Sequence, residues 1–410
     1  MTTTPCPVCD SSKTVEFLRR DSVPVHQNLL LATAEAARSL SSGQLAMTMC
    51  EQCSFVFNSE FDPSLLTYGT DYDNSQTFSP AFDNYVGELV DHLVNEQGVQ
   101  QSSIVEVGCG KGDFLRRLVS VETLGNSGHG FDPAYVGPDV DLDGRLQFHR
   151  QFYDAECSRT PADVVIARHV IEHVAQPREL LSSIRAALNS NPDARVFLET
   201  PCVEWILRHR VAWDFFYEHC SLFTVESLST AAEESGFDVK SVRHVFGGQY
   251  LWLEATPASP AQTHTSATSR TVPSNGAGLT DSHELLQLAH EYGITEAHRN
   301  AAWQSRIREN AQSSGLALWG AGAKGVTFAN LVDPHRRLID CLVDVNPNKQ
   351  GQFLAGTGHP IVSPESLSQR NIRTVVVLNP NYCHEIRQQL AQANMPVTVV
   401  DLMNEGVKAA

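Results

Sequence analysis

The 410-residue sequence has no apolar run long enough to span a membrane and no excess of basic side chains. The first absence argues against a membrane protein, since a spanning helix needs about 20 apolar residues in succession. The formal charge of −17, from 30 basic and 47 acidic residues, disfavours nonspecific binding to nucleic acid or to an anionic membrane. The start, Met1-Thr2-Thr3-Thr4-Pro5, lacks the basic and apolar regions of a signal peptide, so we expect a cytoplasmic protein.

A glycine-rich turn between an apolar strand and an amphipathic helix is the most informative segment, and it reads Val105-Glu106-Val107-Gly108-Cys109-Gly110-Lys111-Gly112-Asp113. Its spacing lets the backbone approach a ligand where a side chain would clash, and it places a carboxylate at the strand end. The next strand ends in Asp132, about twenty residues after the glycines, where an acid can accept from ribose hydroxyls.

This turn resembles the first motif of S-adenosylmethionine-dependent methyltransferases with a Rossmann-like fold, and a dinucleotide-binding turn of a dehydrogenase is the alternative. A later strand, residues 162–169, ends in His169 and leads into Val170-Ile171-Glu172-His173-Val174, which resembles the motif in which a strand ends beside the methyl donor. For His169 and His173, packing beside the donor is favoured over catalysis. The donor-binding residues that the resemblance implies are Glu106, Gly108, Gly110, Asp132 and His169.

Four of the ten cysteines form two pairs, Cys6-Pro7-Val8-Cys9 and Cys50-Glu51-Gln52-Cys53. Each pair can direct two thiolates at one ion, so the two pairs can supply the four sulfurs of a tetrahedral zinc site. Disulfides are the alternative, and they fit poorly with a reducing cytoplasm. The predicted ligands of a structural, non-catalytic Zn²⁺ are Cys6, Cys9, Cys50 and Cys53.

The order of the motifs predicts an α/β protein in three parts, because the chain is too long for one compact domain. Residues 1–75 would form a small zinc-binding module. Residues 76–256 alternate strand and helix patterns, which predicts a class I Rossmann-like methyltransferase core. Residues 257–281 are rich in Ser, Thr, Pro, Ala and Gly and predict a linker or mobile loop. Residues 282–410 repeat the pattern of strand, glycine turn and helix and predict a second Rossmann-like domain.

Further motifs follow in order: Phe216-Tyr217-Glu218-His219, Trp319-Gly320-Ala321-Gly322-Ala323-Lys324-Gly325 and Val343-Asp344-Val345-Asn346-Pro347-Asn348-Lys349-Gln350-Gly351. Together with the cysteine pairs and the first glycine turn, they resemble the C-methyltransferases that act on nucleotide-linked deoxysugars. The resemblance spans nearly the whole chain. It implies S-adenosylmethionine as the methyl donor, a small-molecule acceptor such as a nucleotide-linked keto-deoxysugar, and a C-terminal domain that holds the acceptor.

Carbon methylation requires a base that removes a proton beside a carbonyl before the carbon attacks the sulfonium methyl group. The family motif implies that His219 is this base and that Glu218 orients or tunes it, and a structural histidine is the alternative. The polar loop of residues 68–78 resembles a family loop that closes over donor and substrate. We favour Tyr72 over Tyr68 as the side chain that holds the keto or enolate oxygen, and a solvated loop is the alternative.

Two departures from the family pattern concern the substrate. Phe216 stands where the family has a tyrosine, and Gln249 stands where the family tends to continue with serine and, two positions further on, an arginine. An arginine that would clamp a pyrophosphate is thus missing. Lys324, near a predicted helix start, could contact phosphate instead, or simply pack between helix and sheet. An O- or N-methyltransferase of a small natural product and a non-catalytic binding protein are therefore the alternative functions.

Overall fold

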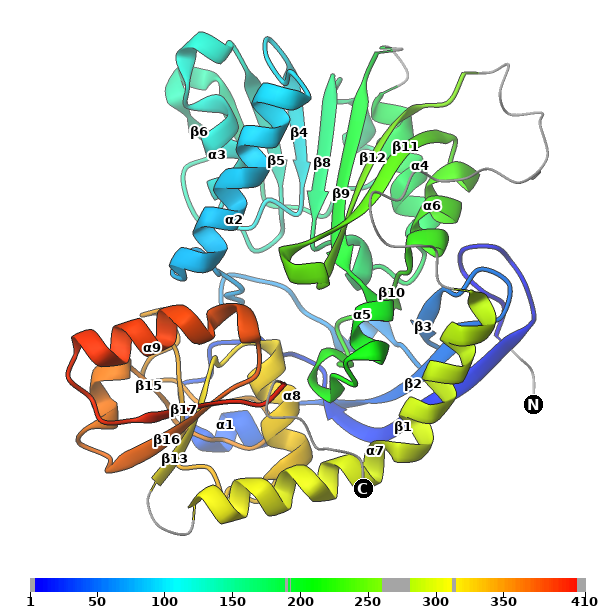
Figure 1. The fold of residues 1–410 in the computed structure, drawn as a ribbon. Coiled ribbons are helices and arrows are strands. Elements are labelled where there is room, and N and C mark those ends of the chain that lie inside the picture. The colour runs from blue at the N-terminus through cyan, green and yellow to red at the C-terminus, as the bar shows by residue number, and fades with distance from the viewer. Residues whose placement is uncertain (1–3, 189–190, 192, 260–280, 312–314, 404–410) are drawn as a thin grey trace.

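The chain is organised around three β-sheets, which Figure 1 shows as an eight-stranded sheet at the top, a four-stranded sheet at lower right and a five-stranded sheet at lower left. The computed structural model describes residues 4–188, 191, 193–259, 281–311 and 315–403. None of the helices in these ranges is both long and apolar enough to cross a membrane.

The four-stranded sheet combines the N-terminal segment with a strand from the middle of the chain. Its order is β1-β2-β3-β10, and every neighbouring pair is antiparallel. Its strands are β1 (Thr14–Pro24), β2 (Ser42–Cys50), β3 (Val56–Asn58) and β10 (Ser221–Leu222), and the short helix α1 (Ala34–Arg38) connects the first two. Because β10 begins just after His219, this sheet fixes the backbone beside that side chain.

The eight-stranded sheet has the order β11-β12-β9-β8-β4-β5-β7-β6. Strand β4 is central and parallel to both β5 and β8, whereas β12 and β6 run antiparallel to their neighbours. The strands are β4 (Ser103–Val107), β5 (Ser127–Phe131), β6 (Val140–Asp141), β7 (Leu146–His149), β8 (Val164–Arg168), β9 (Arg195–Pro201), β11 (Phe237–Val245) and β12 (Tyr250–Pro257).

Helices cover both faces of this sheet because its central strands are apolar on both sides. In β4, Ile104 packs into one core and Val105 into the core on the opposite face. The helices are α2 (Pro80–Asp91) and α3 (Asp113–Val119) on the first face, α4 (Pro177–Ala187) and α6 (Val225–Glu234) on the second, and α5 (Val203–Arg208) after β9. The predicted class I Rossmann-like core is therefore confirmed.

The five-stranded sheet is parallel throughout, in the order β15-β14-β13-β16-β17. Its central strand β13 has β14 on one side and β16 on the other, so the strand order reverses beside β13 as in a Rossmann-like domain. Its strands are β13 (Gly315–Trp319), β14 (Cys341–Val343), β15 (Ile361–Val362), β16 (Ile372–Val377) and β17 (Thr398–Asp401). Its helices are α7 (Ser282–Ala311), α8 (Ala323–Val332) and α9 (Cys383–Gln392). The second Rossmann-like domain is confirmed.

Short helical turns complete the described secondary structure. Turns of 3-10 helix lie at Pro63–Leu65, Glu122–Leu124, Leu142–Gly144, Cys157–Arg159, Ile171–His173, Ala212–Asp214, Phe246–Gly248, Pro364–Leu367 and Pro380–Tyr382, and a π-helical turn at His92–Glu96 extends α2. Most of the predicted linker, residues 260–280, lies outside the described ranges. The exact boundaries between the three parts stay predictions.

The N-terminal segment contacts the C-terminal part of the chain directly. Arg20 of β1 forms a buried ion pair with Glu296 of α7, with 2.5 Å between nitrogen and oxygen. The N–H of Phe353 donates to the carbonyl oxygen of Leu31 at 2.8 Å. The small module therefore packs against the second Rossmann-like domain as well as against the core, whose strand β10 it incorporates.

Candidate active site

The ends of β4 and β5 bring the predicted donor-binding residues together. Gly108 follows β4 with a φ of +67°, and a Cβ there would lie 2.2 Å from Cγ2 of Val170. Backbone conformation and close approach therefore both require glycine. Gly110 also has a positive φ, and its N–H donates to Oδ2 of Asp132 at 2.9 Å. Asp132 thus holds the turn from the end of β5.

A cavity of about 320 Å³, which we call the glycine-turn cavity, lies beside these residues at the carboxyl ends of the parallel strands. Open α/β sheets bind ligands at this edge, next to the point where the strand order reverses. The sequence-predicted residues that line it are Glu106, Gly108, Gly110, Asp132 and His169. The structure thus places all five donor-binding candidates around one cavity.

Glu106 contributes a buried carboxyl group to this cavity. The residue is 4% exposed, and its Oε2 has no hydrogen-bond partner among the described residues. Burial raises the pKa of Glu106 to about 8, although the positive charge of Arg168 opposes the shift. An unpaired oxygen beside a cavity is a ready acceptor for a cationic ligand group.

His169 is held by two buried carboxylates. Its Nδ1 lies 3.2 Å from Oε1 of Glu172, and its Nε2 lies 3.6 Å from Oε1 of Glu199. Burial lowers the pKa of His169, but the two negative charges outweigh burial and raise the pKa to about 9. The protonated ring and the guanidinium of Arg168, which lies 2.6 Å from Glu199, together offset the charges of the two acids, and this role agrees with packing beside the donor rather than with proton abstraction.

A second cavity, of about 240 Å³, adjoins the first and lies between the core and the five-stranded sheet. We call it the interdomain cavity. Its walls include His219 and the residues that follow β13, β14 and β16. The side chains that line both cavities are Tyr72, Asn74, Ser75, Gln76, His169 and His173. The predicted loop of residues 68–78 thus supplies much of the wall that the two cavities share.

His219 stands in the interdomain cavity between two rings. Its ring centroid lies 3.9 Å from that of Phe216 and 4.9 Å from that of His173. Burial, followed by the charges of neighbouring basic side chains, lowers the pKa of His219 well below that of a free histidine. The imidazole is therefore neutral near pH 7 and able to accept a proton.

Contacts from two other segments fix the backbone after His219. The N–H of Asn58 in β3 donates to the carbonyl oxygen of Cys220 at 2.9 Å. The hydroxyl of Ser221 donates to the carbonyl oxygen of Val174 at 2.7 Å. The first contact ties His219 to the N-terminal sheet, and the second ties it to the loop that carries the neighbouring histidine.

The carboxylate of Glu218 faces the N-terminal segment. One oxygen accepts from the N–H of Gln27 at 2.8 Å, and the other lies 3.7 Å from Nδ1 of His26. Within the described ranges no hydrogen bond joins this carboxylate to His219. Burial and the negative charge of Glu218 instead raise the pKa of Tyr72 well above its usual value. Sequence reasoning missed His26 and Gln27, because no local motif marks them.

Two tyrosines of the predicted loop lie together beside these groups. The rings of Tyr68 and Tyr72 meet edge to face with centroids 5.0 Å apart. The Tyr68 hydroxyl lies 3.4 Å from Nδ1 of His173, and the Tyr72 hydroxyl accepts from Nδ2 of Asn28 at 3.4 Å. Burial and Glu218 also raise the pKa of Tyr68. Both hydroxyls therefore stay protonated and can donate a hydrogen bond.

The departures from the family pattern have structural consequences. Tyr217 is fully buried, and its hydroxyl oxygen accepts from the N–H of Asp62 at 2.8 Å, so it does not replace the hydroxyl absent at Phe216. The side-chain amides of Gln249 and Asn379 exchange two hydrogen bonds, of 2.8 and 3.0 Å, in the wall of the interdomain cavity. An uncharged amide pair thus forms the part of the wall where the family tends to have a serine.

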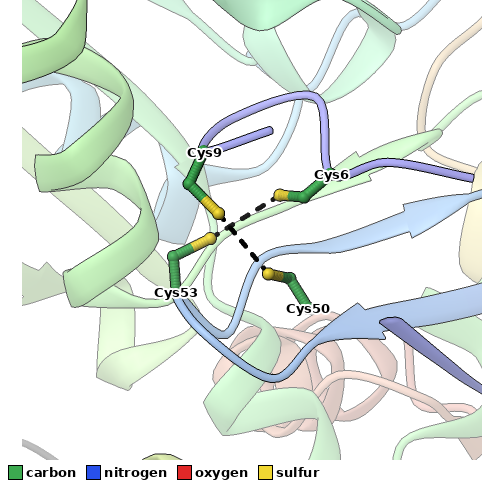
Figure 2. Close-up of side chains that lie close together, drawn as sticks. All are labelled: Cys6, Cys9, Cys50 and Cys53. Atoms are coloured by element: carbon green, nitrogen blue, oxygen red, sulfur yellow. Dashed lines mark hydrogen bonds between the residues drawn. The ribbon is translucent and has the colours of Figure 1, made fainter. Parts of the chain in front are cut away.

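The two cysteine pairs converge on one point, as Figure 2 shows. The sulfur atoms of Cys6 and Cys53 are 3.7 Å apart, and those of Cys9 and Cys50 are 3.5 Å apart. A Zn–S distance of about 2.3 Å in a tetrahedral site separates sulfurs by about 3.8 Å, so the spacing fits zinc. All four cysteines are free, in agreement with a metal site rather than disulfides.

Two family models match the chain, a methyltransferase domain over residues 82–242 and a C-methyltransferase C-terminal domain over residues 255–397. The chain is 24% identical over 391 residues to the C-methyltransferase NovU of Streptomyces niveus, and the match covers 93% of this chain and 90% of that protein.

Solved structures resemble parts of the chain. An O-methyltransferase family protein from Burkholderia thailandensis has a TM-score of 0.34 and 17% identity. The match covers 43% of this chain and 58% of that protein, which is less than two thirds of its length. The 1,6-didemethyltoxoflavin-N1-methyltransferase of the same organism, with bound S-adenosylhomocysteine, has a TM-score of 0.33 and 15% identity, covering 44% of this chain and 80% of its own. Both family models match in order, and a C-methyltransferase is related along nearly its whole length, so the chain is an S-adenosylmethionine-dependent C-methyltransferase in which a methyltransferase domain precedes a C-methyltransferase C-terminal domain.

Proposed function

We propose that this methyltransferase transfers a methyl group to a carbon next to a carbonyl, with His219 as the base and a nucleotide-linked keto-deoxysugar as the acceptor. The observation that supports this proposal most directly is the neutral imidazole of His219 in a cavity that adjoins the glycine-turn cavity. S-adenosylmethionine supplies an electrophilic methyl group when it is bound.

The residues of the glycine-turn cavity would hold the donor. The unpaired Oε2 of Glu106 suits the ammonium group of the donor, and Asp132 is placed at a strand end that suits ribose hydroxyls. The Cβ position of Gly110 has no neighbour within 4 Å in the described part of the chain, which leaves room for the ligand beside the backbone. His169 and Arg168 would offset the charges of the adjoining carboxylates of Glu172 and Glu199.

His219 would remove the proton from the acceptor carbon, because its neutral ring faces the interdomain cavity. A histidine with a lowered pKa is a weak base, so the carbonyl must be polarised at the same time. We propose that Tyr72, with Tyr68 beside it, donates a hydrogen bond to the carbonyl oxygen and stabilises the enolate. Glu218 would then act through the tyrosines, which it keeps protonated, rather than by orienting His219.

The acceptor would lie across the carboxyl ends of β13, β14 and β16, where a parallel sheet with this strand order binds ligands. The relative NovU is a C-methyltransferase, which supports attack by carbon. Among the cavity's polar groups, the side-chain amides of Asn74 and Gln76 and the hydroxyl of Ser75 suit the hydroxyls of a sugar.

We further propose that Cys6, Cys9, Cys50 and Cys53 bind one structural Zn²⁺. Cys6 and Cys9 precede β1, and Cys50 and Cys53 lie at the end of β2 and before β3. Strand β10 extends the same sheet directly after His219. Zinc would therefore support the position of the base without contacting the acceptor.

The test is to supply S-adenosylmethionine with a ¹³C-labelled methyl group together with a nucleotide-linked 4-keto-6-deoxyhexose, and to analyse the product by NMR. A methyl group bonded to carbon is expected. A methyl group on oxygen or nitrogen would instead establish the O- or N-methyltransferase alternative. His219→Gln serves as the control for enzymatic transfer.

A further inference from the structure

Lys349 carries a buried positive charge in the wall of the interdomain cavity. The residue is 6% exposed, and its Nζ donates to Oδ1 of Asn28 at 3.0 Å. Within the described ranges no carboxylate lies at ion-pair distance from it. The charged neighbour Asp73 is already bound by the side-chain amides of Asn346 and Asn348, at 3.1 and 2.9 Å. A lysine is rarely buried without an anionic partner, because desolvation of the ammonium is costly.

The N-terminus of helix α8 lies against the same ammonium group. A Cβ built on Gly322, the N-cap residue, would lie 3.8 Å from Nζ of Lys349. No side chain among the described residues caps this helix of ten residues. The carboxylate of Asp344 instead accepts from the N–H groups of Ala321, at 2.8 Å, and Asn346. An ammonium group next to the positive end of a helix dipole is a repulsive arrangement unless an anion lies between them.

We propose that Lys349 and the N-terminus of α8 form a phosphate-binding subsite of the interdomain cavity. The ammonium and the uncapped N–H groups offer several donors, which match the several acceptor oxygens of a phosphate. The subsite takes the phosphate or diphosphate of the acceptor, and in this respect it rests on the proposed function. Lys324, the phosphate contact that the sequence suggested, is instead paired with Asp214.

Inorganic pyrophosphate and a nucleoside diphosphate are the probes, titrated calorimetrically against the full chain. Both are expected to bind, and Lys349→Met should weaken both by about tenfold or more, as expected for loss of a charge-assisted contact. Lys324→Met is the matched control and should bind both probes nearly as well as the unaltered protein. Failure of the unaltered protein to bind either probe, or unchanged affinity in Lys349→Met, overturns the proposal.

A second variant tests the subsite independently, so that the test does not depend on the folding of Lys349→Met. Gly322 has an ordinary negative φ of −88°, and its Cβ position has no contact closer than 3.5 Å among the described residues, so Gly322→Asp should fold. The new carboxylate would occupy the place of the phosphate and abolish probe binding, whereas the neutral Gly322→Asn should retain it. Equal affinity in these two variants contradicts the subsite.

The proposed function and the subsite can fail separately. If both probes bind through Lys349 but no nucleotide-linked keto-sugar is methylated, the subsite stands and the proposed acceptor is wrong. If the keto-sugar is methylated with the same KM in Lys349→Met and Gly322→Asp, the acceptor stands and the subsite is wrong.

Discussion

The imidazole rings of His173 and His219 meet edge to face, with their centroids 4.9 Å apart. One ring follows β8 of the core, and the other precedes β10 of the N-terminal sheet. The hydroxyl of Ser221, bonded to the carbonyl oxygen of Val174, joins the two segments directly beside the rings. The base that we propose is thus positioned by two sheets at once, and its surroundings keep it neutral.

The acid limb of the pH–rate profile should lie well below pH 6.5, the pKa of an unperturbed histidine. Only neutral His219 accepts a proton, and its neutral fraction falls as the pH drops through its pKa. Because burial and neighbouring charges lower that pKa, activity should persist to lower pH than for a solvated histidine. The measurement is kcat/KM for the acceptor against pH at saturating S-adenosylmethionine, and an acid limb at or above pH 6.5 contradicts the assignment.

Donor binding near pH 7 should release a proton from Glu106. Its carboxyl group is mostly protonated in the free protein, since burial raises its pKa to about 8. The positive charge of S-adenosylmethionine favours the carboxylate and lowers the pKa, so the bound state holds fewer protons. Calorimetry in two buffers of different ionisation enthalpy measures the release, which Glu106→Gln should abolish. Identical heats in both buffers for the unaltered protein count against a donor contact at Glu106.

Alanine should be far less tolerated at Gly108 than at Gly110. Both residues have positive φ, which costs alanine about 1–2 kcal/mol. Only at Gly108 does the added Cβ also meet Val170, at 2.2 Å, whereas the Cβ position of Gly110 has no neighbour within 4 Å in the described part of the chain. We expect Gly108→Ala to lower the free energy of unfolding more and Gly110→Ala to weaken mainly the donor affinity. Pairing Gly108→Ala with Val170→Ala should recover part of the stability, and equal losses at both glycines would contradict the close approach.

The purified protein should contain one Zn²⁺ per chain, measured by elemental analysis. Cys53→Ser should lower both the zinc content and the melting temperature, because a structural zinc site contributes folding energy. Turnover should fall more than donor affinity. The sheet that contains β10 positions His219, whereas the glycine turn that binds the donor belongs to the core. Cys341→Ser, outside the cluster, is the matched control. A zinc-free, stable protein with disulfide-linked cysteines would establish the alternative.

The elements that sequence predicts well here are those with local signals. The glycine turn and Asp132 lie together because adjacent parallel strands end at the same edge of the sheet. The two cysteine pairs can be recognised from the spacing of their residues in the sequence. The surroundings of Glu218 could not be predicted, because its partners His26 and Gln27 lie in another part of the chain and no motif marks them. For the same reason the sequence left open whether Lys324 contacts phosphate or packs between helix and sheet. Its ion pair with Asp214 and the burial of Lys349 are properties of tertiary packing.

The most direct test of His219 as the base is solvent deuterium exchange into the acceptor without the methyl donor. A nucleotide-linked 4-keto-6-deoxyhexose is incubated with the enzyme and S-adenosylhomocysteine in D₂O, and loss of the proton beside the carbonyl is followed by NMR. Exchange is expected with the unaltered protein, and His219→Gln should slow it by about 100-fold or more while the affinity for S-adenosylmethionine stays the same. Exchange at the original rate in His219→Gln would contradict the role of His219 as the base.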